Sequence, residues 1–204
     1  MSQPSEPSFS EKLSKPRPKK PRNLDVRARE YLLSDEVEAM MSAAASVGRH
    51  PKRDRALILL MYRHGLRVSE ASRLRWNQVD LKRAHLHVHR RKQGKPSTHP
   101  LYGDELRLLR QLQRDYPNTP YVFVSERGAH LSERMIHQIV VRAGEKAYLD
   151  FPVHPHMLRH GCGYYLADKG TDTRVIQDYL GHRQIQHTVK YTELAPGRFV
   201  GLWD

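Results

Sequence analysis

Residues 154–160 read His-Pro-His-Met-Leu-Arg-His, and this stretch decides how the fold is interpreted. It opens a segment from about Pro155 to Lys169 that is predicted to be one helix, because Gly170 supplies a helix stop. His156 and Arg159 are i and i+3 in that helix, so both side chains emerge on one face. A guanidinium is a planar, permanently charged donor that suits a phosphate. The stretch therefore predicts a helix with a phosphate-binding face.

Three further segments concentrate groups of the same kind. Arg67 is predicted to lie at a helix junction, after Gly65, which permits an unusual backbone conformation. His182 directly follows a glycine that ends a helix, and Tyr191 comes nine residues later. Taken singly, Arg67 could be a solvated surface charge, His182 a structural histidine and Tyr191 a core residue. Their order and spacing together point to a function.

The pattern along the chain predicts a mainly α-helical (α+β) domain with a small antiparallel sheet at one edge. The apolar residues follow the helical period except between residues 84 and 101, where the period changes to two. Ordered structure is expected to begin near Tyr31. Helices are expected at about 34–48, 53–64, 104–114, 133–148, 155–169, 172–180 and 188–194, with a further short helix after Ser69, and strands at about 84–89, 97–101 and 121–124.

Charge gives the first indication of a partner. The 204 residues include 35 Lys and Arg against 22 Asp and Glu, a formal net charge of +13. Such an excess favours a polyanion, since each neutralised phosphate releases counterions. Nucleic acid is therefore the favoured partner, ahead of an anionic membrane or a merely basic, solvated surface.

Composition also bounds where the chain works. The longest apolar run, residues 56–61, is far short of the roughly 20 residues that a membrane span requires. The single cysteine, Cys162, excludes an internal disulfide, fits a reducing compartment and is interpreted as a buried apolar residue. We expect a cytoplasmic, nucleoid-associated protein with one domain and no membrane contact. Residues 1–23, rich in Pro, Ser and basic side chains, are expected to form a disordered arm that either follows DNA phosphates or aids solubility.

The ordered segments resemble the motifs of the tyrosine site-specific recombinases, the phage-integrase family. Those motifs are an Arg in Gly-Leu-Arg-x-Ser-Glu, a Lys in a β-turn, His-x-Leu-Arg-His, Leu-Gly-His and a Tyr nine residues later, and all occur here in order. The stretches 154–160, 176–183 and 197–204 are similar to the short fimbrial phase-variation inverters. The resemblance covers about residues 30–204. It implies the DNA breaking-rejoining fold over residues 24–204, without the separate core-binding domain of larger members.

The resemblance also implies a reaction. Tyr191 would attack a DNA phosphodiester to form a 3′-phosphotyrosine, while Arg67 and Arg159 hold the phosphate oxygens. His156 would be the base, and His182 a phosphate donor or tyrosine positioner. Neither ATP nor a metal or other cofactor is expected. The implied catalytic residues are Arg67, Lys92, His156, Arg159, His182 and Tyr191, with Lys95 as the alternative to Lys92 for the general acid.

The implied function is inversion of a promoter segment by a homotetramer on two inverted-repeat sites, with an accessory DNA-bending protein as a possible helper. The alternatives are a DNA-binding transcriptional regulator of the same fold without catalysis, and a relaxing topoisomerase. Glu70 is expected to pair with Arg67, and His160 to act as a buttress. The strand histidines His85, His87 and His89, with His99 opposite, suggest a DNA-facing polar sheet more than a metal site.

Overall fold

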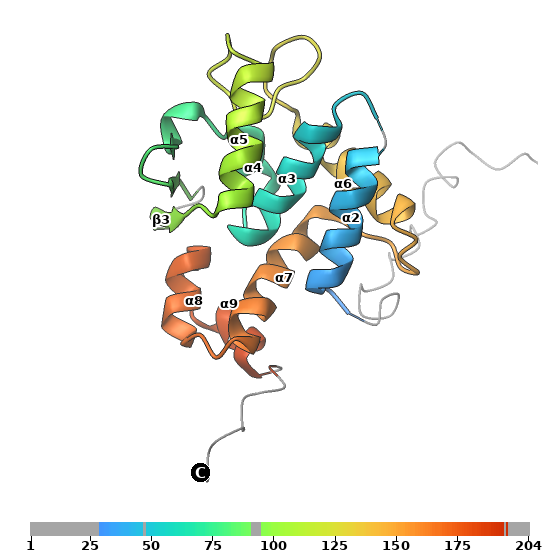
Figure 1. Ribbon diagram of the computed structural model, residues 1–204. Coiled ribbons are helices and arrows are strands. Elements are labelled where there is room, and N and C mark those ends of the chain that lie inside the picture. Colours follow the sequence, from blue (N-terminus) through green and yellow to red (C-terminus); the bar gives the residue numbers. More distant parts are fainter. Residues whose placement is uncertain (1–28, 47, 91–94, 194, 196–204) are drawn as a thin grey trace, which may run out of the picture. The chain divides into compact units, whose positions relative to one another are not determined.

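The computed structural model describes residues 29–46, 48–90, 95–193 and 195. Contacts divide the chain into residues 1–30 and 31–204. The predicted arm, residues 1–23, lies outside the described residues, so the second unit carries all of the architecture below. That unit is mainly helical with one small sheet (Figure 1).

The described helices and strands follow the expected order, with three differences, one of which is a short 3-10 helix over Trp76–Gln78 that was not predicted. The strand expected over 121–124 is absent: Tyr121 and Val124 make only isolated bridges, to Arg75 and His130. The side chains of residues 122–124 are all buried, whereas those of a half-buried strand would alternate between buried and exposed. This segment therefore fills the core as a loop. A two-residue strand, β1, was not predicted. The elements are α2 (Ser34–Ser46), α3 (Pro51–Arg63), α4 (Val68–Ser72), η2 (Trp76–Gln78), β1 (Val79–Asp80), β2 (His85–Val88), β3 (Ser97–Pro100), α5 (Gly103–Asp115), α6 (Glu133–Lys146), α7 (Pro155–Asp168), α8 (Thr173–Leu180) and α9 (Gln186–Glu193).

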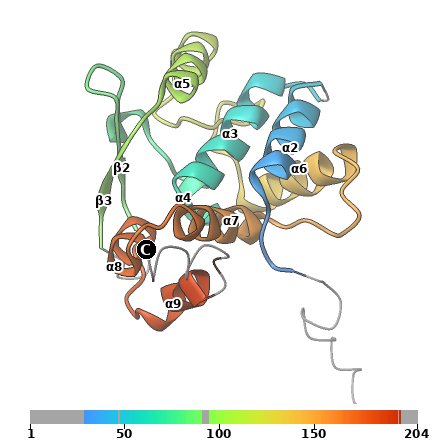
Figure 2. The ribbon, with the colours of Figure 1, turned by 60° about the horizontal axis from the view of Figure 1, so that its bottom comes forward.

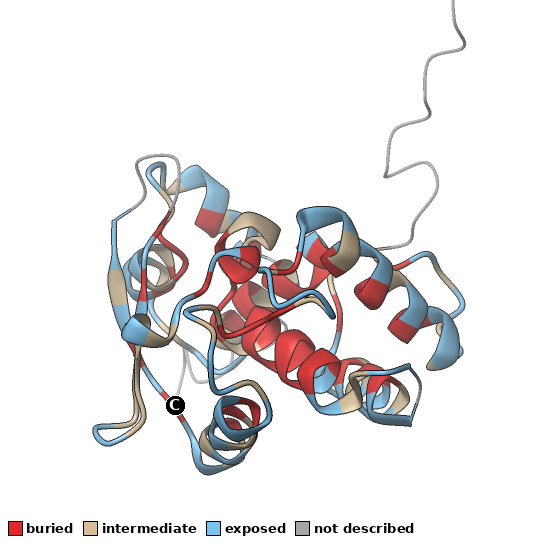
Figure 3. Cartoon of the chain, turned by 90° about the horizontal axis from the view of Figure 1, so that it is seen from above, coloured by how far each residue is buried: buried red, intermediate tan, exposed pale blue. Residues whose placement is uncertain are grey.

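Helix α3 is the centre of the main core. Its residues 56–62 are all buried, which is the pattern of a helix covered on every side. Helices α2, α5 and α7 pack against it, and α6 packs on α2. Seen from above, the buried residues gather where these helices face one another (Figure 3). None of the described helices is long and apolar enough to cross a bilayer.

The sheet has the antiparallel order β1-β2-β3. Leu86 pairs with His99 and Val88 with Ser97. Leu86 and Val88 are buried while His87 and His89 are exposed, which confirms the predicted alternation. His99 does not join the exposed histidines, because its side chain points inward and is 1% exposed.

Helices α7, α8 and α9 form a second, smaller cluster at the C-terminal side (Figure 2). Asp172 caps α8 by accepting the N–H groups of Arg174 and Val175, and Gly181 ends it at φ +65°. The buried members of this cluster are Cys162, Ala167, Ile176, Leu180 and Tyr191. Tyr191 is therefore held by a small apolar cluster and not by the main core.

Candidate active site

Arg67 is placed by the sharp turn between α3 and α4. Gly65 has φ +54°, and a Cβ there would lie 2.4 Å from Leu180 Cδ2. Only glycine fits this turn without strain, and the turn brings the end of α8 against the start of α4. Arg67 is the N-cap of α4, where Glu70 accepts both its backbone N–H, at 3.0 Å, and its Nη1, at 2.8 Å. The expected Arg67–Glu70 pair is confirmed.

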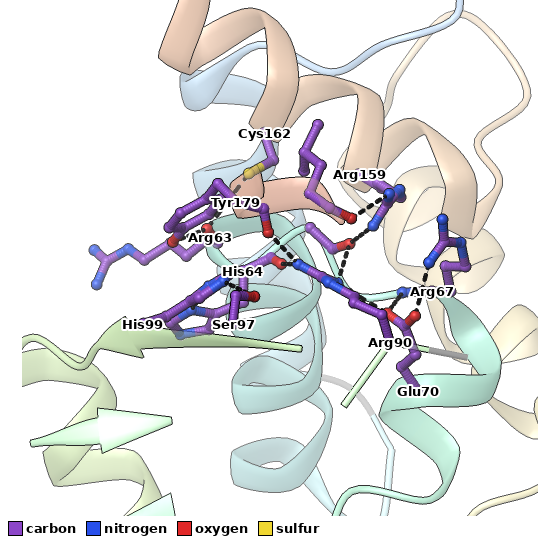
Figure 4. Close-up of polar contacts among 12 residues, drawn as sticks. Arg63, His64, Arg67, Glu70, Arg90, Ser97, His99, Arg159, Cys162 and Tyr179 are labelled. Atoms are coloured by element: carbon purple, nitrogen blue, oxygen red, sulfur yellow. Dashed lines mark hydrogen bonds and ion pairs between the residues drawn. The ribbon is translucent and has the colours of Figure 1, made fainter. Parts of the chain in front are cut away.

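Arg159 connects the Gly-Leu-Arg motif at residues 65–67 with the Leu-Gly-His motif at residues 180–182. It leaves α7 fully inside the protein, at 1% exposure. Its Nη1 donates to the Gly65 carbonyl, and its Nη2 donates to the Leu180 carbonyl at 2.7 Å (Figure 4). The Arg159 guanidinium thus holds together the turn at Gly65, which precedes Arg67, and the turn at Leu180, which precedes His182.

The site carries an excess of positive charge. Arg67, Arg90 and Arg159 converge on the Gly65 turn, and the described ion pairs give them one carboxylate, Glu70. Burial, and then the charges of Arg90 and Arg67, lower the pKa of Arg159 to about 9. Burial favours the neutral form of Glu70, but Arg90 and Arg67 outweigh it and hold the pKa of Glu70 below its usual value. A cluster with surplus cations and an ionised partner is prepared for an anion.

Tyr191 lies beside this cluster and is 1% exposed. Its ring packs edge-on against Tyr164, at 5.0 Å between centroids, and nearly parallel to His182, at 6.2 Å. A Cβ on Gly163 would lie 2.7 Å from the ring, so this glycine makes room for it. Burial raises the pKa of Tyr191 above its ordinary value, against the lowering effect of Arg159.

The histidine at the Tyr191 hydroxyl is His160. Its Nδ1 lies 2.8 Å from the hydroxyl oxygen. The predicted base, His156, is exposed and contacts the His160 ring edge-on, with centroids 4.4 Å apart. Sequence reasoning treated His160 as a buttress only, although its position one turn after His156 on the same face was a usable signal.

The three histidines are neutral at pH 7. Partial desolvation by the surrounding protein, with the charge of nearby residues, lowers the pKa of His156 to about 4 and of His160 and His182 to about 3. A neutral imidazole can accept a proton or a hydrogen bond. His182 is oriented by its Nδ1, which lies 2.8 Å from the Thr188 hydroxyl, so Nε2 is the nitrogen left to face a ligand.

The lysine that would complete the set is placed only in part. Lys92 lies outside the described residues. Lys95 is exposed, and its Nζ lies 4.0 Å from the Asp178 carboxylate on α8. Both therefore remain candidates for the general acid.

The sequence also drew attention to Cys162 and to three histidines of the sheet. Cys162 is buried, and burial raises the pKa of its thiol to about 12, so it is inert. His85, His87 and His89 share the sheet face, but over the described ranges no group of three His, Cys, Asp or Glu is close enough to hold a metal ion.

The chain belongs to the phage integrase family, which its sequence matches over residues 30–198. This confirms the resemblance drawn from the motifs. It is 44% identical to the type 1 fimbriae regulatory protein FimB of Escherichia coli K12 over 185 residues, 88% of this chain and 92% of FimB. FimE of the same strain is also 44% identical, over 182 residues, 86% of this chain and 91% of FimE.

Solved structures give the same family. The crystal structure of XerA recombinase superposes with a TM-score of 0.73 and 28% identity, covering 83% of this chain and 62% of that chain. The catalytic-domain fold predicted from the sequence is thereby confirmed, and the enzyme class is that of the tyrosine recombinases.

Proposed function

We propose that this chain cuts and rejoins DNA at specific sites through a 3′-phosphotyrosine on Tyr191. The observation that carries the proposal is the double contact of Arg159, which joins the Gly65 and Leu180 carbonyls. Through it, the residues of four separate segments surround one positively charged position. Of the three guanidinium groups there, that of Arg67 is 29% exposed, so an incoming phosphate meets it first.

The chemistry follows from the charges. Attack of the Tyr191 oxygen on phosphorus forms one P–O bond and breaks the bond to the 5′ oxygen, so bond energy is preserved. The transition state gathers negative charge on the non-bridging oxygens, and Arg67 and Arg159 are fixed cations beside it. One preorganised donor of this kind is worth roughly 3–4 kcal/mol in other enzymes. Two arginines supply the charge neutralisation that a metal supplies in other phosphoryl transfers.

Proton transfers complete the step. The Tyr191 proton passes to an imidazole: His160 already lies at the hydroxyl, and His156 lies next to it. The 5′ oxygen takes a proton from a lysine of the β2–β3 turn, Lys92 or Lys95. Comparing His156→Gln with His160→Gln in single-turnover cleavage identifies the base, because loss of a general base costs about 10²–10⁴-fold.

The described state is a resting one for catalysis. At 1% exposure Tyr191 has no face open to a DNA phosphate, so the hydroxyl must be uncovered before attack. Helix α9 rests on the small C-terminal cluster, which is the element best suited to shift when DNA binds.

The net charge of +13 supports double-stranded DNA as substrate. Similarity to the type 1 fimbriae regulatory proteins supports a role in fimbrial regulation. We infer that the chain inverts a promoter segment between inverted repeats, as a homotetramer and with a DNA-bending helper. Residues 24–204 would form the catalytic domain and residues 1–23 a basic arm.

The test is a plasmid that carries a segment flanked by inverted repeats, once sequencing of the DNA beside the gene has identified such repeats. Wild-type protein is expected to invert it, as read by PCR across one junction. Arg67→Ala and Arg159→Ala should still shift the repeat DNA in a gel, yet invert at least about 100-fold more slowly. Binding without inversion or cleavage by the wild type would instead establish a non-catalytic regulator.

A further inference from the structure

Arg90 is a buried arginine that no motif singled out. It is the second residue after β2, and its side chain is 0% exposed. Its guanidinium makes four described contacts (Figure 4). Nη1 donates to Glu70 Oε2 at 2.9 Å and to the Gly65 carbonyl at 3.3 Å, while Nη2 donates to the His64 carbonyl at 3.1 Å and to the Tyr179 carbonyl.

These contacts connect Arg90 to Arg67 through one carboxylate. Glu70 Oε2 accepts from Arg90 and from the Arg67 backbone N–H, while Oε1 accepts from Arg67 Nη1. The carboxylate is therefore held in one orientation from behind. Since the Arg67 side chain is 29% exposed and contacts this carboxylate at 2.8 Å, the fixed carboxylate is what aims its guanidinium.

The aliphatic stem of Arg90 contacts the turn that precedes His182. A Cβ on Gly181 would lie 2.6 Å from Arg90 Cγ and 3.0 Å from Cδ. The stem thus fills the space beneath this left-handed glycine, and Nη2 holds the carbonyl of Tyr179 two residues earlier. Loss of the stem or the fork would free the turn.

Lysine cannot reproduce this arrangement. The four acceptors come from the turn at His64 and Gly65, from Glu70 on α4 and from Tyr179 near the end of α8, and they lie around one planar fork, whereas an ammonium is a compact point charge. A lysine at this position keeps the charge opposite Glu70 but not the simultaneous hold on both turns.

We propose that Arg90 is a positioning residue for strand cleavage: it aims Arg67 through Glu70 and holds the turn that carries His182. We assign it no contact with the DNA phosphate, because Nη1 and Nη2 each already donate two hydrogen bonds, to Glu70 and to the carbonyls of Gly65, His64 and Tyr179. The inference rests on the proposed function, since it assigns Arg90 a part in the alignment of that site.

The test is single-turnover cleavage of nicked repeat DNA, where the covalent adduct accumulates and slow rates can be followed. Arg90→Lys is expected to keep DNA affinity within about threefold and to slow adduct formation by about 10- to 100-fold, the cost of a misalignment near 1 Å. The matched control is Arg53→Lys. Arg53 is also buried, pairs with Asp54 and donates to the Val124 carbonyl, but lies away from the site. It should cleave at the wild-type rate.

A double-mutant cycle separates positioning from general destabilisation. If Arg90 acts through Arg67, the loss in Arg90→Lys combined with Arg67→Ala is smaller than the product of the single losses by at least about fivefold. If the rate losses of the two single variants multiply in the double variant, or if Arg90→Lys cleaves at the wild-type rate, the role of Arg90 is overturned while the proposed function still stands. Absence of any adduct with wild-type protein overturns the proposed function, and this role with it.

Discussion

Replacing Gly163 with alanine tests whether Tyr191 is packed as the structure shows. The new Cβ would lie 2.7–2.8 Å from three atoms of the Tyr191 ring. Ordinary carbon contacts are about 3.5–4.0 Å, so the ring must retreat by about 1 Å or leave. Retreat strains the cluster by about 1–3 kcal/mol. Departure loses about 2–3 kcal/mol of burial and about 1 kcal/mol for the His160 hydrogen bond.

Against either cost stands the better helix propensity of alanine, about 1 kcal/mol. The expected net loss in the free energy of unfolding is about 1–2 kcal/mol, measured by denaturant titration. The matched control is Gly103→Ala, where a Cβ meets nothing within 4 Å, so the free energy should change by less than about 1 kcal/mol and in the stabilising direction.

Access to the Tyr191 ring gives a second readout for Gly163→Ala. Nitration of tyrosines, mapped by peptide mass spectrometry, should modify Tyr148, which is 91% exposed, and spare Tyr191 in the wild type. In Gly163→Ala the nitration of Tyr191 should rise toward that of Tyr148. A variant as stable as Gly103→Ala, with Tyr191 still protected, would refute the packing argument.

Three further changes have defined outcomes. Gly65→Ala places a side chain on a left-handed backbone, which costs about 1–2 kcal/mol, and brings its Cβ within 2.4 Å of Leu180. We expect these two costs together to lower the free energy of unfolding by about 2 kcal/mol or more. An unchanged melting temperature would contradict this. Burial lowers the pKa of His160 to about 3, so as pH falls below about 6.5 the unfolded chain takes up a proton at this residue and the folded chain does not. Going from pH 7 to pH 5 should therefore lower the free energy of unfolding by up to about 2 kcal/mol through His160. In denaturant titrations at the two pH values, His160→Gln should lose correspondingly less stability than the wild type. Thr188→Val removes the 2.8 Å contact with His182 Nδ1, so the free energy of unfolding should fall by about 1 kcal/mol and DNA cleavage should slow while DNA affinity is unchanged. If the variant and the wild type cleave at the same rate, the contact does not orient His182.

The helices and the β2–β3 pair were predictable because their signals are local. Asp172 and Gly181 mark the two ends of α8, and the alternation of Leu86 and Val88 with histidines marks β2. The segment 121–124 was misread because a short apolar run fits both a strand and a core-filling loop, and only its neighbours decide.

The sequence singled out residues that the structure brings together, but it did not indicate their contacts. The spacing of the motifs named Arg67, Arg159 and Tyr191. The contact between His160 and Tyr191 spans 31 positions, and the one between Arg90 and the Tyr179 carbonyl spans 89. Such contacts depend on how α7, α8 and α9 pack, which no local pattern encodes.

The central claim is that Tyr191 becomes covalently joined to DNA. The direct measurement is mass spectrometry of proteolysed adduct, formed on nicked repeat DNA and trapped by denaturation. The account predicts a phosphodeoxynucleotide on the peptide containing Tyr191, a free 5′-hydroxyl on the released strand, and no adduct with Tyr191→Phe. A nucleotide attached to any other residue, or an adduct that persists in Tyr191→Phe, would contradict it.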